Sequence, residues 1–275
     1  MIDNALIKKI ETAALEVRRK FLDIAFGMSP KPLHFGGGLS TVDILATLYF
    51  GVMNYDVNNP TWENRDRFFL SKGHSVLGYY ITLAKAGFIT DEELLTYGQN
   101  ETFLPGHPVI NKEKGIESTN GSLGMGLAVG IGNAIAAKKK NLAFRSYVLM
   151  GDGECNEGSV WEAVMAAPHF KLDNLTAIVD RNRWQQTGAG SDIMDVGDLR
   201  EKFSSFGWHA VEINGHNITD IYMALNEDTS GKPKAIIAKT VKGKGFSFSE
   251  ENNAWHHAVL TEKLYNLGLT ECGRD

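Results

Sequence analysis

Hydrophobic and polar positions at the start of the chain form a helical pattern. From Ile2 to Ile24, apolar residues recur every three to four positions, with charged residues between them. This spacing predicts an amphipathic helix rather than a signal peptide. No apolar run in the sequence approaches the roughly 20 residues that a membrane-spanning helix needs.

Short apolar runs and helical patterns alternate through the rest of the chain. The predicted strands are RFFLS (67–71), SYVLM (146–150), LTAIVD (175–180), HAVEI (209–213) and KAIIAKT (234–240). The predicted helices between them are VLGYYITLAKAG, GSVWEAVMAAPHF, residues 199–206 and TDIYMALNE. Alternation at this spacing predicts an α/β fold, with a doubly wound, mostly parallel sheet and helices on both faces. No linker or repeat interrupts the pattern, so we expect a single domain over residues 1–275.

Three segments carry additional local signals. Ser40 is expected to cap a helix formed by TVDILATLYFGVM. Thr90 and Glu93 are expected to form a capping box for EELLTYG. The segment GSLGMGLAVGIGNAIAA (121–137) is rich in small residues, which indicates a loop that enters a buried helix.

The composition narrows the possible functions. Hydrophobic residues make up 43% of the chain and charged residues 22%, as in ordinary soluble globular proteins. The 28 basic and 33 acidic residues give a net charge of −5, which argues against nucleic-acid binding. Two cysteines, Cys155 and Cys272, are too few for a disulfide framework or a zinc site, so a reducing cytoplasm is the expected setting.

A carboxylate and a carboxamide follow two neighbouring predicted strands. Asp152 lies between two glycines just after SYVLM, and Asn182 follows LTAIVD one helix and one strand later. Ligands bind at the carboxyl ends of parallel strands, and a right-handed crossover brings these two ends together. Two hard oxygen ligands favour Mg²⁺ or Ca²⁺ over zinc. Gly-Asp-Gly alone is also common in β-turns. The prediction of a cation that binds a diphosphate therefore depends on the pairing of Asp152 with Asn182.

Four of the eight histidines lie in loops beside small or rigid residues, where an imidazole can face a ligand. They are His34 in HFGGGLS, His74 in SKGHS, His107 in PGHP and His256 in AWHHA. Together they indicate a polar cleft that handles hydroxyl groups. His169, His209 and His216 lie in or beside predicted elements and are interpreted as surface or core residues. His257 adjoins His256, and one of this pair is expected to point away from the cleft.

Seven motifs together resemble the N-terminal, thiamine-diphosphate-binding segment of transketolase. They are HFGGGLS, RDRFFLSKGH, LPGHP, GSLGMGLAVGIGNA, GDGECNEGSVWEA, KLDNLTAIVDRN and TVKGKG, in compatible order and spacing over nearly the whole chain. The cofactor motif of the family is GDG followed by Asn. The resemblance therefore implies thiamine diphosphate bound through Mg²⁺, or Ca²⁺, which is held by Asp152, Asn182 and the carbonyl of Trp184.

The resemblance also implies roles for the residues around this cation. It assigns contacts with the diphosphate to Gly153, His74 and His256, contacts with the aminopyrimidine to Gly121, Ser122 and Leu123, and catalysis in the substrate channel to His34, His107 and His256. Glu157 would join a carboxylate network across a subunit interface. The implied reaction transfers a two-carbon ketol unit from a ketose, or a ketose phosphate, to an aldose.

The chain is much shorter than full-length transketolases. They are more than twice as long and carry the glutamate that activates the cofactor on a second, pyrimidine-binding domain. The resemblance therefore implies a split transketolase, in which a separate C-terminal subunit supplies that domain. A two-fold heterotetramer fits this arrangement. At the channel, Phe35 stands where the family usually has proline, and His257 where it usually has glycine.

Three other functions compete with this one. Glycines in GSLGMGLAVG are compatible with a dinucleotide-binding oxidoreductase, but the preceding NKEKGIESTN is not the strand that such a fingerprint requires. Another thiamine-diphosphate enzyme subunit, related to deoxyxylulose-phosphate synthase, dihydroxyacetone synthase or a 2-oxoacid dehydrogenase, stays open, although the histidines favour a sugar. A regulatory subunit without catalysis also stays open, although Asp152, Asn182 and His74 weigh against it.

Overall fold

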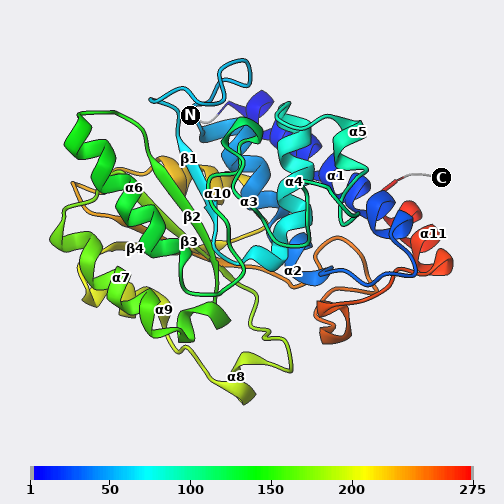
Figure 1. Ribbon diagram of the computed structural model, residues 1–275. Helices are drawn as coiled ribbons and strands as arrows, with labels where there is room; N and C mark the ends of the chain where they lie inside the picture. Colours follow the sequence, from blue (N-terminus) through cyan, green and yellow to red (C-terminus); the bar gives the residue numbers. More distant parts are fainter. Residues whose placement is uncertain (1–2, 274–275) are drawn as a thin grey trace.

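A five-stranded parallel sheet forms the centre of the protein, in a computed structural model that describes residues 3–273 (Figure 1). The strands are β1 (Arg67–Leu70), β2 (Ser146–Gly151), β3 (Leu175–Arg181), β4 (His209–Asn214) and β5 (Lys234–Lys239). They lie in the order β1-β2-β3-β5-β4, and each neighbouring pair is parallel. The predicted fold class is confirmed, while the assignment of residues 1–275 to one domain stays a prediction.

Helices cover both faces of the sheet (Figure 1). One face carries α1 (Asn4–Gly27), α3 (Val42–Thr47), α4 (Val76–Ala86) and α10 (Ile218–Asn226), and the other carries α6 (Gly126–Lys140), α7 (Gly158–His169) and α9 (Leu199–Ser205). Along β2, Tyr147 and Leu149 belong to the first core and Val148 and Met150 to the second. This alternation is expected because successive side chains of a strand face opposite sides.

The loops between these elements contain several short helices and helical turns. They are α2 (Gly36–Leu39), α5 (Asp91–Leu94) and α8 (Gly190–Ile193), with 3₁₀ turns at Gly73–Ser75, Lys112–Lys114, Gly153–Asn156 and Asn253–His256 and a π turn at Leu48–Val52. The capping box of Thr90 and Glu93 is confirmed, although the helix that it starts already ends at Leu94.

Two local predictions are wrong. Ser40 does not cap α3, since its hydroxyl lies 3.0 Å from the Gly37 carbonyl and 2.8 Å from Oδ2 of Asp180. Helix α6 is buried on one side only, because Leu127 faces the sheet while Val129 is 44% exposed. No strand lies within residues 117–125 before α6, which agrees with the rejection of a dinucleotide fingerprint.

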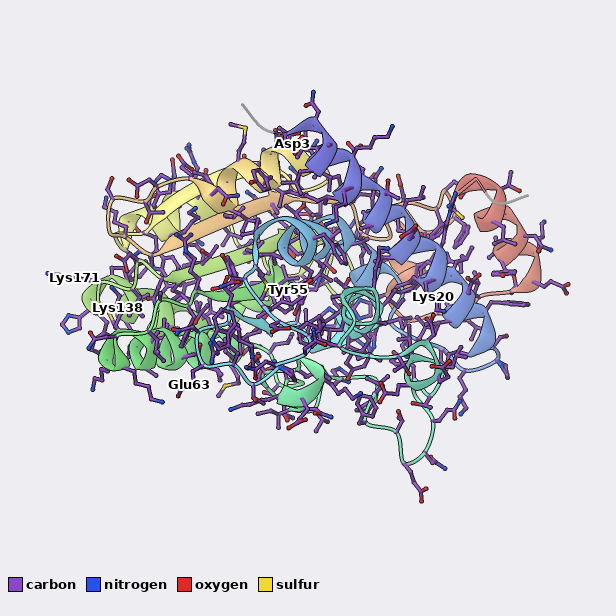
Figure 2. The ribbon with its side chains drawn as sticks, turned by 90° about the horizontal axis from the view of Figure 1, so that it is seen from above. Asp3, Lys20, Tyr55, Glu63, Lys138 and Lys171 are labelled. Atoms are coloured by element: carbon purple, nitrogen blue, oxygen red, sulfur yellow. The ribbon has the colours of Figure 1, made fainter. Side chains whose placement is uncertain are left out.

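Helix α11 (Glu262–Glu271), which no sequence pattern predicted, packs beside α1. Figure 2 shows it in red next to the part of α1 that carries Lys20. Arg19 of α1 donates from Nε to the carbonyl of Cys272 at 2.8 Å, and so holds the end of α11. Ile2, which belongs to the predicted first helix, lies outside the described residues. Within residues 3–273, no helix is long and apolar enough to cross a membrane.

Gly130 and Gly132 offer a matched test of the packing between α6 and β2. A Cβ at Gly130 would lie 2.4 Å from Cγ2 of Val148, whereas a Cβ at Gly132 would have no neighbour within 4 Å. We expect Gly130→Ala to lower the free energy of unfolding by about 1–3 kcal/mol, because overpacking a core is unfavourable. Gly132→Ala should raise it by up to about 1 kcal/mol, because alanine favours a helix. Urea unfolding measures both changes, and equal effects would contradict this packing.

Candidate functional site

A cavity of about 550 Å³ lies where β1, β2 and β3 end. Eleven of the predicted site residues line it: His34, His74, His107, Gly121, Leu123, Asp152, Gly153, Glu157, Asn182, Trp184 and His256. Ser122 alone is outside the lining, although both of its neighbours in the turn belong to it. The residues meet here because the carboxyl ends of parallel strands lie at one edge of the sheet. Their individual roles stay predictions.

Asp152 and Asn182 face the same stretch of backbone. Oδ2 of Asp152 accepts a hydrogen bond from the Arg183 N–H at 2.7 Å, and Oδ1 of Asn182 accepts one from the Trp184 N–H at 3.0 Å. Burial, followed by the nearby Asp180 carboxylate, raises the pKa of Asp152 to about 6. Two side-chain oxygens therefore converge at one wall of the cavity, and such oxygens suit a hard divalent cation.

Asp180, which the sequence analysis did not single out, ties these strand ends together. Its fully buried carboxylate accepts hydrogen bonds from Ser40 (2.8 Å), from Nδ2 of Asn182 (2.9 Å), from Thr240 and from Lys72. Burial alone would raise the pKa of Asp180, but the Lys72 ammonium holds it below its ordinary value. Because Nδ2 of Asn182 binds Asp180, Oδ1 turns toward Trp184. The signal in the sequence was a charge directly after the apolar run LTAIV, since a buried charge needs a partner.

Glu154 is the second site residue that the sequence analysis missed. Its carboxylate accepts hydrogen bonds from the N–H groups of Gly124 (2.8 Å) and Gly151 (3.0 Å) and from the hydroxyl of Ser71. It therefore joins the end of β1, the GDG loop and the turn at residues 121–124. Gly124 has a φ of 82°, which glycine adopts without strain. The available signal was an acidic residue immediately after Gly-Asp-Gly.

Four imidazoles surround that of His34. Its ring centroid lies 5.6 Å from those of His74 and His107, 5.5 Å from that of His256 and 4.8 Å from that of His257. Burial, followed by the neighbouring His257, lowers the pKa of His34 to about 4. Burial, followed by the charge of Lys242, lowers the pKa of His256 to about 4. Both imidazoles are therefore neutral near pH 7, and Nδ1 of His256 is buried without a hydrogen-bond partner among the described residues.

Of the pair His256 and His257, only His256 lines the cavity, while His257 is exposed beside His34. Leu33 and Ala258 form an antiparallel bridge, with a hydrogen bond of 3.0 Å in each direction. This bridge sets His34 and His257 side by side. The other three histidines lie at the surface or in the interior as expected: His169 is exposed, His209 lies 3.1 Å from Glu227, and His216 is hydrogen-bonded to Asp43.

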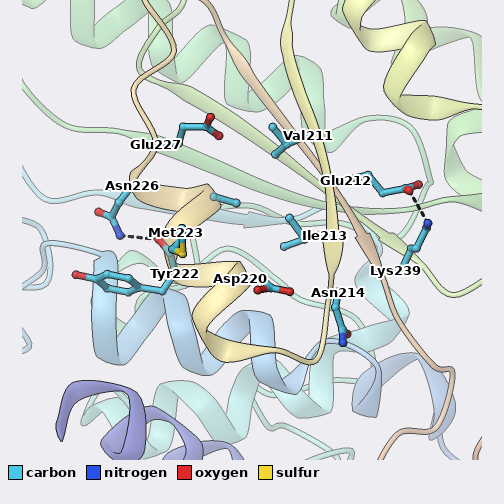
Figure 3. Close-up of a pocket in the computed structure, with 11 residues that line it drawn as sticks. Val211, Glu212, Ile213, Asn214, Asp220, Tyr222, Met223, Asn226, Glu227 and Lys239 are labelled. Carbon is cyan, nitrogen blue, oxygen red and sulfur yellow. Dashed lines mark hydrogen bonds and ion pairs between the residues drawn. The ribbon is translucent and has the colours of Figure 1, made fainter. Parts of the chain in front are cut away.

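A wider groove, of about 1040 Å³, lies between the edge strand β4 and α10 (Figure 3). Apolar side chains such as Ile213 and Met223 line it, and Glu212 at its rim pairs with Lys239 at 2.5 Å. It lies at the opposite edge of the sheet from β1 and contains none of the predicted site residues. Charged rim residues at an edge strand typically prevent pairing with another chain. We therefore place the functional site at the strand ends and not in this groove.

Most of the chain matches a known protein family. Residues 19–272 match the family model described as the transketolase, thiamine diphosphate binding domain. The chain belongs to the transketolase family. It is 41% identical to one subunit of the apulose-4-phosphate transketolase of Phocaeicola vulgatus, over 96% of this chain and 94% of that protein. It is 40% identical to a 6-deoxy-6-sulfo-D-fructose transketolase subunit of Clostridium sp., over 88% of this chain and 89% of that protein.

Solved transketolases share the fold. The transketolase of Leishmania mexicana has a TM-score of 0.89 at 32% identity, and the match covers 97% of this chain but 41% of that one. The transketolase of Campylobacter jejuni has a TM-score of 0.87 at 30% identity, over 100% of this chain and 44% of that one. The chain thus spans less than half of these transketolases but nearly all of its apulose-4-phosphate transketolase relative. The sequence predicted the N-terminal subunit of a split transketolase, and it predicted a transferase of the transketolase type. Both predictions are confirmed.

The half-buried imidazoles of His34 and His256 predict how stability depends on pH. The pKa of His34 and of His256 is about 4 in the folded protein against an ordinary value of 6.5, so the unfolded chain binds protons first as the pH falls. We expect the free energy of unfolding to decrease between pH 6.5 and about pH 4. His34→Asn should flatten this decrease, while the exposed His169→Asn should leave it unchanged. Urea unfolding at several pH values measures the slopes, and identical slopes for His34→Asn and the unmodified protein would refute the assignment.

Proposed function

We propose that this chain is the diphosphate-binding subunit of a two-chain transketolase. With thiamine diphosphate and Mg²⁺, or Ca²⁺, the complex transfers a two-carbon ketol unit from a ketose or ketose phosphate to an aldose. A separate C-terminal subunit supplies the pyrimidine-binding domain and the glutamate that activates the cofactor. The observation that carries the proposal is a single cavity lined by both the Asp152–Asn182 pair and the histidine cluster.

The cavity suits a diphosphate held through a cation. Its volume of about 550 Å³ lies within the usual range for small-molecule sites. Asp152 and Asn182 offer two oxygens, and the carbonyl of Trp184 offers a third that accepts no hydrogen bond from the described residues. Gly153 lines the cavity, and without a side chain it lets a phosphate oxygen approach the backbone closely. His74 adds a donor for the diphosphate at the end of β1.

The imidazoles of the cavity suit the binding of sugar hydroxyl groups and the exchange of protons with them. Thiamine diphosphate supplies the carbanion and the electron sink when it is bound. His34, His107 and His256 bind the hydroxyl groups of the substrate, and His34 and His256 accept a hydroxyl proton as general bases. The same imidazoles return the proton, so they act as base and acid in turn. The turn of Gly121, Ser122 and Leu123 orients the aminopyrimidine.

The exposed side of α6 and α7 carries apolar side chains that suit contact with another subunit. Met125, Val129 and Met165 are 51%, 44% and 62% exposed, and such apolar patches are typical of association surfaces. Glu157, at the start of α7, is exposed at the same end and also lines the cavity. In the proposed heterotetramer, two copies of this chain meet here, and Glu157 joins a carboxylate network across the interface.

Asp152→Asn tests the cation site. The substitution keeps an acceptor for the Arg183 N–H but removes the charge that a divalent cation requires. We expect Mg²⁺-dependent binding of thiamine diphosphate to the complex to weaken on the order of 100-fold, at least as much as loss of a supporting residue does. Calorimetry measures the affinity, and thermal unfolding verifies that the variant is folded. Asp192→Asn, an exposed neighbour of the cavity, is the control, and unchanged affinity of Asp152→Asn would rule out the cation site.

The need for a second subunit is tested by reconstitution. The chain alone should transfer no ketol unit between a ketose phosphate and an aldose, because the activating glutamate is on the partner. Mixing with the C-terminal subunit should produce the activity, measured by formation of the new ketose. Full activity of the chain alone would overturn the two-chain arrangement. Turnover of 2-oxoacids by the mixture would indicate another thiamine-diphosphate enzyme, and cofactor binding without turnover would indicate a regulatory subunit.

A further inference from the structure

A buried ion cluster away from the cavity joins three distant parts of the chain. Arg18 of α1 donates from Nη1 and Nη2 to the Asp43 carboxylate at 2.9 and 2.6 Å, and Nδ1 of His216 lies 2.7 Å from Oδ2 of the same carboxylate. Burial alone would raise the pKa of Asp43, but His216 and Arg18 hold it at about 2. Asp43 is therefore a carboxylate at every physiological pH. None of the three residues lines the cavity.

The other side of this cluster holds the segment 241–245, which follows β5. Nε2 of His216 accepts a hydrogen bond from the Val241 N–H at 2.8 Å. Because Nε2 is an acceptor, Nδ1 carries the proton and donates it to Asp43. Nε of Arg18 donates to the carbonyl of Lys244 at 3.3 Å, so the cluster grips the segment at both ends.

The gripped segment carries Lys242 toward the cavity. Lys242 is 2% exposed, and its Nζ donates to the carbonyl of Gln185 at 3.1 Å and to Oδ1 of Asn253 at 2.8 Å. Asn253 in turn donates to the carbonyl of Gln186 at 3.0 Å. Gln185 and Gln186 line the cavity, and Asn253 begins the 3₁₀ turn that presents His256. One ammonium group thus joins two walls of the cavity.

We propose that Arg18, Asp43 and His216 form a positioning clamp for the active site. The clamp fixes the backbone on both sides of Lys242, and the long lysine side chain transmits this position to the Gln185–Gln186 wall and to His256. A lysine has several rotatable bonds, so its amine is held in place only when its backbone is also held. Small displacements at such walls reduce binding and turnover strongly. The proposal rests on the proposed function for the identity of the bound cofactor.

Two substitutions of His216 separate its two hydrogen bonds. In His216→Asn, the amide nitrogen takes the place of Nδ1, which keeps the bond to Asp43 but loses the acceptor for Val241. In His216→Gln, the amide oxygen takes the place of Nε2, which keeps the acceptor for Val241 but loses the donor to Asp43. His209→Asn on β4, outside the clamp, is the control.

The clamp is measured by hydrogen exchange of the backbone amides in residues 241–245 of the chain without cofactor. We expect exchange to accelerate about tenfold or more in His216→Asn and to stay within about threefold in His216→Gln and in the control. In the complex with the partner subunit, calorimetry with Mg²⁺ and thiamine diphosphate should show about tenfold weaker binding for His216→Asn only.

Other patterns overturn the clamp. Equal losses of exchange protection and cofactor affinity in both His216 variants would show that His216 stabilises the fold in general. If neither variant loses protection or affinity, the clamp proposal is wrong. Faster exchange in His216→Asn with unchanged cofactor affinity would show that the position of residues 241–245 does not affect binding in the cavity. Failure of the unmodified complex to bind thiamine diphosphate contradicts the proposed function instead, and the exchange measurement then still tests the grip on residues 241–245.

Discussion

The ion pair between Lys72 and Asp180 fixes the ends of the central strands. Both side chains are almost completely buried, at 1% and 0% exposure, and the pair reaches from the end of β1 to the end of β3, across β2. Removal of one partner would leave an isolated charge in the interior, which typically costs about 3–5 kcal/mol. The three strand ends are therefore held in one arrangement, and the cavity takes its shape from them.

The same pair determines the charge that a ligand meets in the cavity. Asp180 is ion-paired with Lys72, whereas Asp152 has no ion-pair partner within 4 Å among residues 3–273, and burial followed by Asp180 raises its pKa. A divalent cation bound by Asp152 would compensate the charge of this carboxylate. Asp180 also orients the amide of Asn182 through its Nδ2, although it does not face the cavity itself. Supporting groups of this kind commonly tune a metal site.

The sequence was sufficient to predict features that depend on the spacing of apolar residues within a segment and on the general topology of parallel sheets. All five strands appear where the apolar runs lie, and Asp152 and Asn182 meet because parallel strands end at one edge. The failures concern residues whose partners are far away in the chain. Ser40 has the local signature of a cap, but its partner Asp180 is 140 positions away, and Glu154 binds Ser71 at a separation of 83. No local pattern reveals such contacts. Helix α11 was missed for the same reason, because its packing partner is α1.

Helix α1 is joined to parts of the chain that lie far from it in the sequence. Arg18 contacts Lys244 across 226 positions, and Arg19 contacts Cys272 across 253. During synthesis, Arg18 can therefore pair with Asp43 well before Lys244 has been made, whereas Arg19 can bind the Cys272 carbonyl only after that residue has emerged. Closing a loop of this length costs conformational entropy, which is lost before the long-range contact forms. The contacts of α1 with Lys244 and Cys272 can therefore form only after all five strands of the sheet have been synthesised.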